Sequence, residues 1–405
     1  MKRLIRIIST NDPPFTPMTF TRQPVVQRFW YGGLLIGLIG FALGFALWMW
    51  QHGTLNIQGD YFFWKHEHAR LQIAGFLGSF LLGFALQSGP HVTGGKPPES
   101  RYLLWLCHLL WTGVAITFLP APWSTIGQIM ISVTYAGAGL FLLQVTRAGN
   151  PRLRLPRGYP LAAGMTLMSL SPWLPLDEPA IALYLLWCGP VTMALVAAQQ
   201  LIQNVIGGQW LQDRPAIHFI SSLILAWGSS ALAAFTPVGS WQLSGLFWLT
   251  TLMLLLHGTG FIPAAWRLGW KSINVTLSLG FAHAIICALW LILADGHLDV
   301  AVHLLGAAFL TTLIIGVTVR VAGFFSAGAV LSDHVTSLLL GGWAIIAWVR
   351  AFSPVWPMDE IWTAWISVGG ALILGLWGVR TGHRLMQIRT LVPVALGGTK
   401  DATNP

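Results

Sequence analysis

The chain has few charged residues, which make up only 9% of its 405 residues. An ordinary soluble domain has about 25% charged residues. Hydrophobic residues account for 55% of the sequence, and this composition places the chain in the membrane class. In a membrane chain the location of the charges matters more than their sum. We therefore expect a lipid bilayer as partner, and we do not interpret the net charge of +9 as a nucleic-acid signature.

Cysteine is also scarce, and its three positions, Cys107, Cys188 and Cys287, all lie within apolar runs. The sequence contains no CxxC and no CxxCH motif. This argues against a disulfide framework, a zinc knuckle and a c-type haem site. The first 27 residues lack a long apolar core, so we expect a cytoplasmic lead-in over residues 1–28 instead of a cleavable signal.

Glycine (44) and tryptophan (22) are abundant, which suits close helix contacts and interfacial anchoring in a bilayer. The apolar runs are long enough for spanning helices of roughly 20 residues. We therefore predict an all-α polytopic membrane protein with a twelve-helix domain over 29–378 and a cytoplasmic tail over 379–405. The predicted spans lie near 29–50, 69–87, 102–120, 123–145, 160–176, 180–201, 216–236, 241–264, 273–294, 299–323, 335–351 and 358–378.

Lysine and arginine are distributed unevenly over the loops between these spans. With the N-terminus inside, one side receives 19 of them and the other side receives only Lys65, Arg70 and Arg350. Cytoplasmic loops of membrane proteins carry the excess of Lys and Arg, so we predict that both termini are cytoplasmic. The implied location is the inner membrane of a bacterial cell.

A dense polar cluster stands at the outer end of the second span, in "DYFFWKHEHARLQIAGF" (60–76). On a regular helix the rings of its HxH pair would diverge by about 200°, whereas in an extended segment they would share a face. The pair could ligate one metal together, or each ring could serve a different partner. Glu67 could orient an imidazole N–H, as carboxylates commonly do around metal-binding histidines. Alternatively, the cluster has no ligand and only caps the helix at the membrane interface, with its acidic side chain near the helix N-terminus. The cluster comprises Asp60, Lys65, His66, Glu67, His68 and Arg70.

Further histidines could join this cluster. His303 stands near the start of the tenth span, at a depth similar to that of His66 and His68, so these residues could converge on one outer site. His283 lies deeper, within the ninth span, where an ionisable group usually faces the bundle interior. It could be a ligand or a neutral histidine bonded to a neighbouring helix. Arg320 could anchor its span at the inner interface or pair with an anionic cofactor group.

Several stretches resemble the NnrS family of bacterial membrane proteins. That family carries W-H-x-H-E-M followed by G-F-L-L-T-A-x-P-N-W-T-G, and here the corresponding stretch is "FFWKHEHARLQIAGFLGSFLLGFALQSGPHVTGG". One register matches His66-Glu67 to the His-Glu dipeptide, and another matches His66 and His68 to the HxH pair. The stretch at 300–323 resembles H-A-L-T-V-G-A-x-G-x-M-T-L-A-V-M-T-R, with His303, Gly306 and Arg320 matching.

Two further stretches match motifs of this family, and one expected motif is missing. "IGGQ" at 206–209 is similar to the family's I-G-G-R, with Gln209 where Arg is usual, and 254–272 is similar to its L-H-A-x-R-L-x-x-W-x-G-W stretch. The G-H-T-G-R-P-L segment that normally follows Arg320 is absent, so the chain resembles a divergent member.

The resemblance implies a twelve-span bundle with haem b and copper as cofactors, associated with nitric oxide metabolism and nitrosative stress. Together with the depth of these residues, it predicts cofactor binding by His66, His68, His303 and His283, with metal ligation by the first three and with Glu67 and Arg320 in supporting roles. His283 is included on its depth alone. A small gas such as nitric oxide could reach an apolar outer site from the lipid, and a redox or oxidase partner is compatible with such a protein. No catalytic residue is assigned.

Two other functions remain open on the sequence. A secondary transporter would place intramembrane His and Arg along a substrate path, although no similarity between the two halves of the chain is evident. An assembly protein that delivers metal to a partner oxidase would need only transient ligands. A terminal oxidase or nitric oxide reductase is disfavoured because such proteins use an adjacent His-His pair for copper, and the sequence contains no HH.

Overall fold

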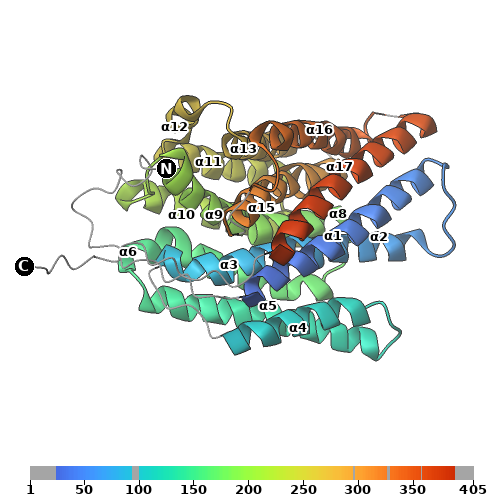
Figure 1. The fold of residues 1–405 in the computed structure, drawn as a ribbon, viewed down its shortest axis with the longest axis horizontal. Coiled ribbons are helices and arrows are strands. Elements are labelled where there is room, and N and C mark those ends of the chain that lie inside the picture. The colour runs from blue at the N-terminus through green and yellow to red at the C-terminus, as the bar shows by residue number, and fades with distance from the viewer. Residues whose placement is uncertain (1–23, 94–99, 295–296, 326–328, 357, 388–405) are drawn as a thin grey trace, which may run out of the picture.

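The computed structural model describes residues 24–93, 100–294, 297–325, 329–356 and 358–387. These residues form helices and connecting turns and contain no strand, as the apolar pattern predicts. Most helices run roughly along the long axis of the molecule (Figure 1). The terminal segments predicted as lead-in and tail lie largely outside the described residues.

Each of the twelve predicted spans corresponds to a helical segment. Here η denotes a stretch of π-helix, except η3, which is a 3₁₀-helix. In chain order the elements are α1 (Pro24–Gln51), α2 (Tyr61–Arg70), η1 (Leu71–Leu77), α3 (Gly78–Thr93), α4 (Ser100–Ile116), α5 (Trp123–Ala148), α6 (Pro151–Leu153), η2 (Arg154–Gly158), α7 (Tyr159–Leu167), η3 (Met168–Trp173), α8 (Pro179–Leu186), η4 (Trp187–Val191), α9 (Thr192–Leu201), η5 (Ile202–Ile206), α10 (Asp213–Phe235), α11 (Trp241–Gly258), α12 (Phe261–Leu268), α13 (Ser272–Leu293), α14 (Leu298–His303), η6 (Leu304–Leu310), α15 (Thr311–Phe325), α16 (Asp333–Phe352) and α17 (Glu360–Gln387).

The helices are those of a multi-pass membrane protein. Within the described part of the chain, nine helices are long and apolar enough to cross a bilayer, and the bent pair α11 and α12 would make a tenth. The two remaining predicted spans correspond to α4, whose apolar part is shorter, and to α7 with its flanking turns. The crossing count of twelve therefore stays a prediction.

Three spans form the centre of the bundle. They run over Tyr61–Gln87, Pro179–Ile206 and Leu298–Gly323, and 83%, 78% and 67% of their apolar windows are buried, against 50% or less in the other long spans. Each contains at least one π segment, and η6 packs against both η1 and η4. Such π segments inside α-helices frequently occur at functional sites.

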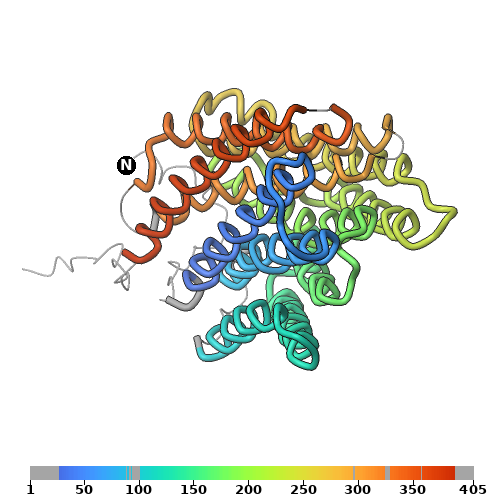
Figure 2. The backbone as a smooth tube through the Cα atoms, turned by 90° about the vertical axis from the view of Figure 1, so that its right-hand side faces the viewer, coloured from blue at the N-terminus to red at the C-terminus, as the bar shows by residue number. Residues whose placement is uncertain are grey.

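Glycine allows the hairpin of α4 and α5 to close tightly. A methyl group on Gly127 would lie 2.7 Å from the carbonyl oxygen of Gly113, and one on Gly113 would lie 3.0 Å from that of Gly127. The two backbones therefore touch, which is how small residues hold helices together in a membrane. The hairpin lies at one edge of the bundle (Figure 2), where α5 packs against α7 and α3.

The loops that join α1 to α2 and α4 to α5 lie at the same end of the molecule, at the right of Figure 1. This is the arrangement expected if the helices between them each cross once, and it identifies the end that the charge distribution predicts to be outside.

The topology can be tested by thiol labelling of spheroplasts. A cysteine in place of exposed Gln58, between α1 and α2, should react with a membrane-impermeant maleimide. A cysteine in place of exposed Lys271, between α12 and α13, should react only after permeabilisation. The three native cysteines are buried, so the unmodified chain serves as the blank. Equal labelling of both positions in intact spheroplasts would contradict the predicted orientation.

Candidate functional site

The polar cluster at the start of α2 begins with a helix cap. The carboxylate of Asp60 accepts a hydrogen bond from the backbone N–H of Phe62 at 3.0 Å, which satisfies one of the open donors of the first turn. Because α2 is helical through Arg70, His66 and His68 point in different directions. Of the two geometries open for the HxH pair, the structure therefore shows the one in which each ring has its own partner.

His66 is held through both ring nitrogens. Its Nδ1 lies 3.1 Å from Oδ1 of Asp177, and its Nε2 accepts a hydrogen bond from the guanidinium of Arg70 at 2.8 Å. Its side chain is 22% exposed, and it does not line the cavity that contains His68 and His303. A ring with both nitrogens occupied has no lone pair to offer a metal. The ligand role of His66 stays a prediction, and this geometry favours other candidates.

His68 is oriented by the first helix. Its Nδ1 lies 2.9 Å from the carbonyl oxygen of Gly40, which can only accept, so Nδ1 carries the proton. A side chain at Gly44 would clash with the imidazole, because the ring lies directly against the α1 backbone there. Nε2 has no hydrogen bond among the described residues, and it is therefore the nitrogen with a free lone pair.

His303 shows the same arrangement on α14. Its Nδ1 lies 2.8 Å from the backbone carbonyl oxygen of Asp299 and 3.4 Å from the Asp299 carboxylate. The carboxylate is also 3.7 Å from the guanidinium of Arg350. Nε2 of His303 again has no hydrogen-bond partner in the described chain. The two imidazoles are thus held in the same protonation state by two unrelated backbone carbonyls.

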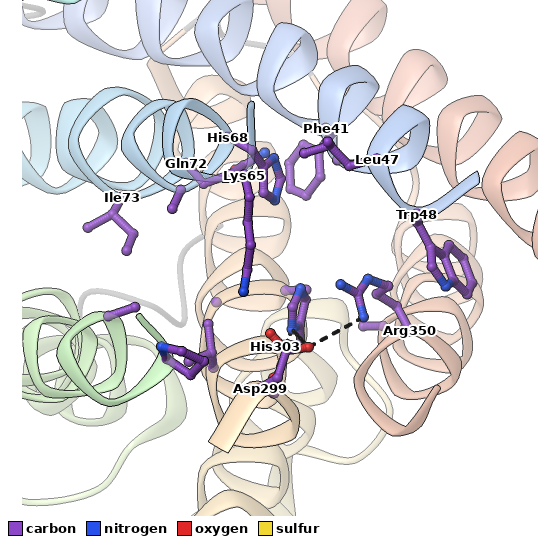
Figure 3. A pocket seen from close by; sticks show the side chains of 18 of the residues that line it. Phe41, Leu47, Trp48, Lys65, His68, Gln72, Ile73, Asp299, His303 and Arg350 are labelled. Atoms are coloured by element: carbon purple, nitrogen blue, oxygen red, sulfur yellow. Dashed lines mark hydrogen bonds and ion pairs between the residues drawn. The ribbon is translucent and has the colours of Figure 1, made fainter. Parts of the chain in front are cut away.

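His68 and His303 line one cavity of about 370 Å³, at the end of the bundle where α2 and α14 begin and α16 ends. This volume is in the range of small-molecule and cofactor pockets. Figure 3 shows the two rings across the cavity from one another, with Lys65 and Arg350 on either side of His303. The remaining walls are mostly apolar and aromatic, including Phe41, Leu47, Trp48, Ile73, Trp343 and Ile346.

The other predicted residues lie elsewhere. His283 is 1% exposed on α13, with its ring 6.0 Å from that of Trp348 and its Nδ1 unpartnered, and it does not line this cavity. Arg320 is exposed on α15 and is also outside the cavity lining. His283 is hydrogen-bonded to the backbone of Ala308 on η6, as in the alternative of a histidine bonded to a neighbouring helix. The predicted cofactor roles of His283 and Arg320 stay untested.

Glu67 pairs with arginine instead of orienting an imidazole. Its Oε1 lies 2.9 Å from the guanidinium of Arg70, and the two side chains are 3% and 7% exposed. Arg70 in turn bonds to His66, so these three residues and Asp177 form one chain of contacts beside the cavity. This chain links the start of α2 to the residues just before α8.

Three residues of the cavity were not singled out as site residues from the sequence: Lys65, Asp299 and Arg350. The charge distribution could have indicated two of them, because Lys65 and Arg350 are two of the three cations predicted on the outer side. No sequence pattern indicates Asp299, because its contact with Arg350 depends on the approach of α16 to α14.

The donor set limits which metal could bind. Among the described residues, no group of three or more His, Cys, Asp or Glu side chains is placed to hold an ion. Structural zinc sites use four protein ligands and catalytic ones three, so the cavity does not suit zinc. Haem iron needs only an axial ligand or two from the protein, such as histidine. Two imidazoles with free Nε2 atoms therefore fit haem, whereas copper would need further ligands.

Comparison with known protein families gives a match to the NnrS protein family over residues 29–389. The match covers nearly the whole described chain, including both helices that carry the cavity histidines. A comparison with curated proteins gives no match.

Removal of Arg70 should destabilise the fold. In Arg70→Ala the nearly buried carboxylate of Glu67 loses its partner, which should cost about 3–5 kcal/mol of unfolding free energy. The double variant Glu67→Leu, Arg70→Met should be close to the native chain, since it removes both charges together. The free energy of unfolding is measured by titrating the detergent-solubilised protein with SDS. Equal stability of Arg70→Ala and the double variant would argue against a buried ion pair.

Proposed function

Because the chain belongs to the NnrS family, we propose that it is a nitric-oxide-related membrane protein that binds haem in the cavity between His68 and His303. We place it in the inner membrane of a bacterial cell, where it would act in the response to nitric oxide and nitrosative stress. Copper is a second candidate cofactor, supported by the same family and by imidazole ligands.

The main support is the state of the two imidazoles. Metal-binding histidines almost always donate their second ring N–H to a carbonyl or carboxylate, which fixes the tautomer and the ring orientation. His68 does this to Gly40, and His303 does it to Asp299. In each case Nε2 is left without a partner in a cavity that both residues line. The protein thus holds two unprotonated nitrogens ready to bind iron.

The environment suits a small uncharged ligand. Haem iron would supply the centre that binds such a gas. The cavity walls are mostly apolar, and the surrounding helices are of bilayer-crossing length, so a gas dissolved in the membrane could reach the site. The Asp299 carboxylate beside His303 would raise the basicity of that imidazole, as carboxylates do around metal-binding histidines.

The ligand assignment can be tested by optical spectroscopy. His68→Ala and His303→Ala should each lose most of the Soret absorbance per protein, because each removes one free Nε2. His66→Ala and the exposed His218→Ala should retain it, since neither position offers a free nitrogen to the cavity. Metal analysis should follow the absorbance. Full loading in both cavity variants would overturn the assignment, and a colourless but folded native protein would overturn haem binding.

A substitution that touches no ligand gives an independent test. Gly44→Val would displace the His68 ring from its contact with the α1 backbone and break the hydrogen bond to Gly40. Haem affinity should fall roughly 10- to 100-fold, as for lost supporting contacts at metal sites. Gly375→Val is a matched control, because a side chain there would meet open space. Haem titration of the two variants measures the difference, and equal affinities would exclude the role of α1.

A further inference from the structure

Lys65 enters the cavity without a partner. It projects from α2 toward His303 (Figure 3), and its ammonium makes no hydrogen bond or ion pair with any described residue. An ammonium has three donors, and none of those of Lys65 has a hydrogen-bond acceptor among the described residues. The third outer cation, Arg70, by contrast uses both terminal nitrogens of its guanidinium, one on Glu67 and the other on His66.

Arg350 has spare donors on the other side of His303. Its guanidinium donates to the Ser353 hydroxyl at 3.2 Å, and its nearest carboxylate, that of Asp299, lies 3.7 Å away, beyond good hydrogen-bond distance. Arginine has five N–H donors in a planar fork that matches carboxylates. Most of these donors therefore have no partner in the described chain.

The carboxylates that line the cavity leave much of this capacity unused. Asp177 is engaged by His66, and Asp299 is shared between His303 and Arg350, 3.4 Å from the imidazole Nδ1 and 3.7 Å from the guanidinium. Lys65 and Arg350 come from different helices and flank His303 on opposite sides. The result is two separate cationic points in one cavity with unfilled hydrogen-bonding capacity.

We propose that Lys65 and Arg350 form a clamp for two carboxylate groups of the molecule bound in the cavity. The proposal rests on the proposed function, because a haem carries two such groups on one edge. Lys65 acts as a point charge on one carboxylate, and Arg350 binds the other through its planar fork. The clamp orients the ligand edge toward the end of the bundle where α2 begins.

Porphyrin binding to the purified full-length chain in detergent tests this clamp. Protoporphyrin IX has the two carboxylates but no iron, and its dimethyl ester has neither charge. The native chain should bind the free acid roughly 100-fold more tightly than the ester, as expected for two additional charge-assisted hydrogen bonds of about tenfold each. Lys65→Met should lose about tenfold of this preference, and Lys65→Arg should keep it.

The controls separate charge from packing and from iron ligation. Lys271→Met, at an exposed cation outside the cavity, should leave the preference unchanged. Equal binding of acid and ester by the native chain would overturn the clamp, and so would a loss in Lys65→Met that is the same for both. His68→Ala should weaken haem binding but not protoporphyrin binding. If haem binds no better than protoporphyrin, the assignment of His68 as an iron ligand fails. The clamp is then decided by the difference in affinity between the free acid and the ester.

Discussion

A polar side chain inside a membrane protein must find its hydrogen-bond partners within the protein, because the hydrocarbon core offers none. The candidate site depends on how this requirement is met. His66, Glu67 and Arg70 are paired with one another beside the cavity. His68 and His303 are satisfied on one nitrogen only, by backbone carbonyls that leave the other nitrogen free. All three histidines have an acceptor at Nδ1, and the difference lies at Nε2, which Arg70 occupies in His66 alone.

The central spans set the shape of the cavity around these rings. The π segments η1 and η6 follow His68 and His303 within a few residues, and the two segments pack against each other. A π segment holds more residues per turn than an α-helix, so it shifts the side chains that follow it relative to those before it. The polar ends of α2 and α14 can therefore face the cavity while the apolar residues beyond them face the bundle core.

Much of this could be predicted from the sequence because it depends on local composition. Each of the twelve apolar runs corresponds to a helical segment, and the cluster at 60–70 begins a helix at one end of the bundle. The expected approach of His303 to the HxH pair is found for His68. Depth along a span can be counted in residues, which is why histidines at equal depth could be grouped.

Other features depend on which helices touch, and no local pattern encodes that. The sequence predicted a ligand role for His66, but its Nδ1 is held by Asp177, more than a hundred residues away, and its Nε2 by Arg70. The hydrogen bond from His68 to the backbone carbonyl of Gly40 cannot be predicted from the sequence, because every residue has such a carbonyl. The break between α11 and α12 had a clearer origin, since Gly260 adopts φ +61° there and the helix axis turns by 60°. The run of 241–264 was predicted as one straight span because its hydropathy is continuous.

The cavity is built from residues far apart in the chain, from Phe41 on α1 to Arg350 at the end of α16. This has a consequence for biosynthesis. A membrane chain is synthesised and inserted from its N-terminus, so His68 enters the bilayer long before its opposite wall exists. The two imidazoles and both cations come together only when all but the last helix, α17, has been made. Any molecule held by both imidazoles would therefore be seated only in a nearly complete chain.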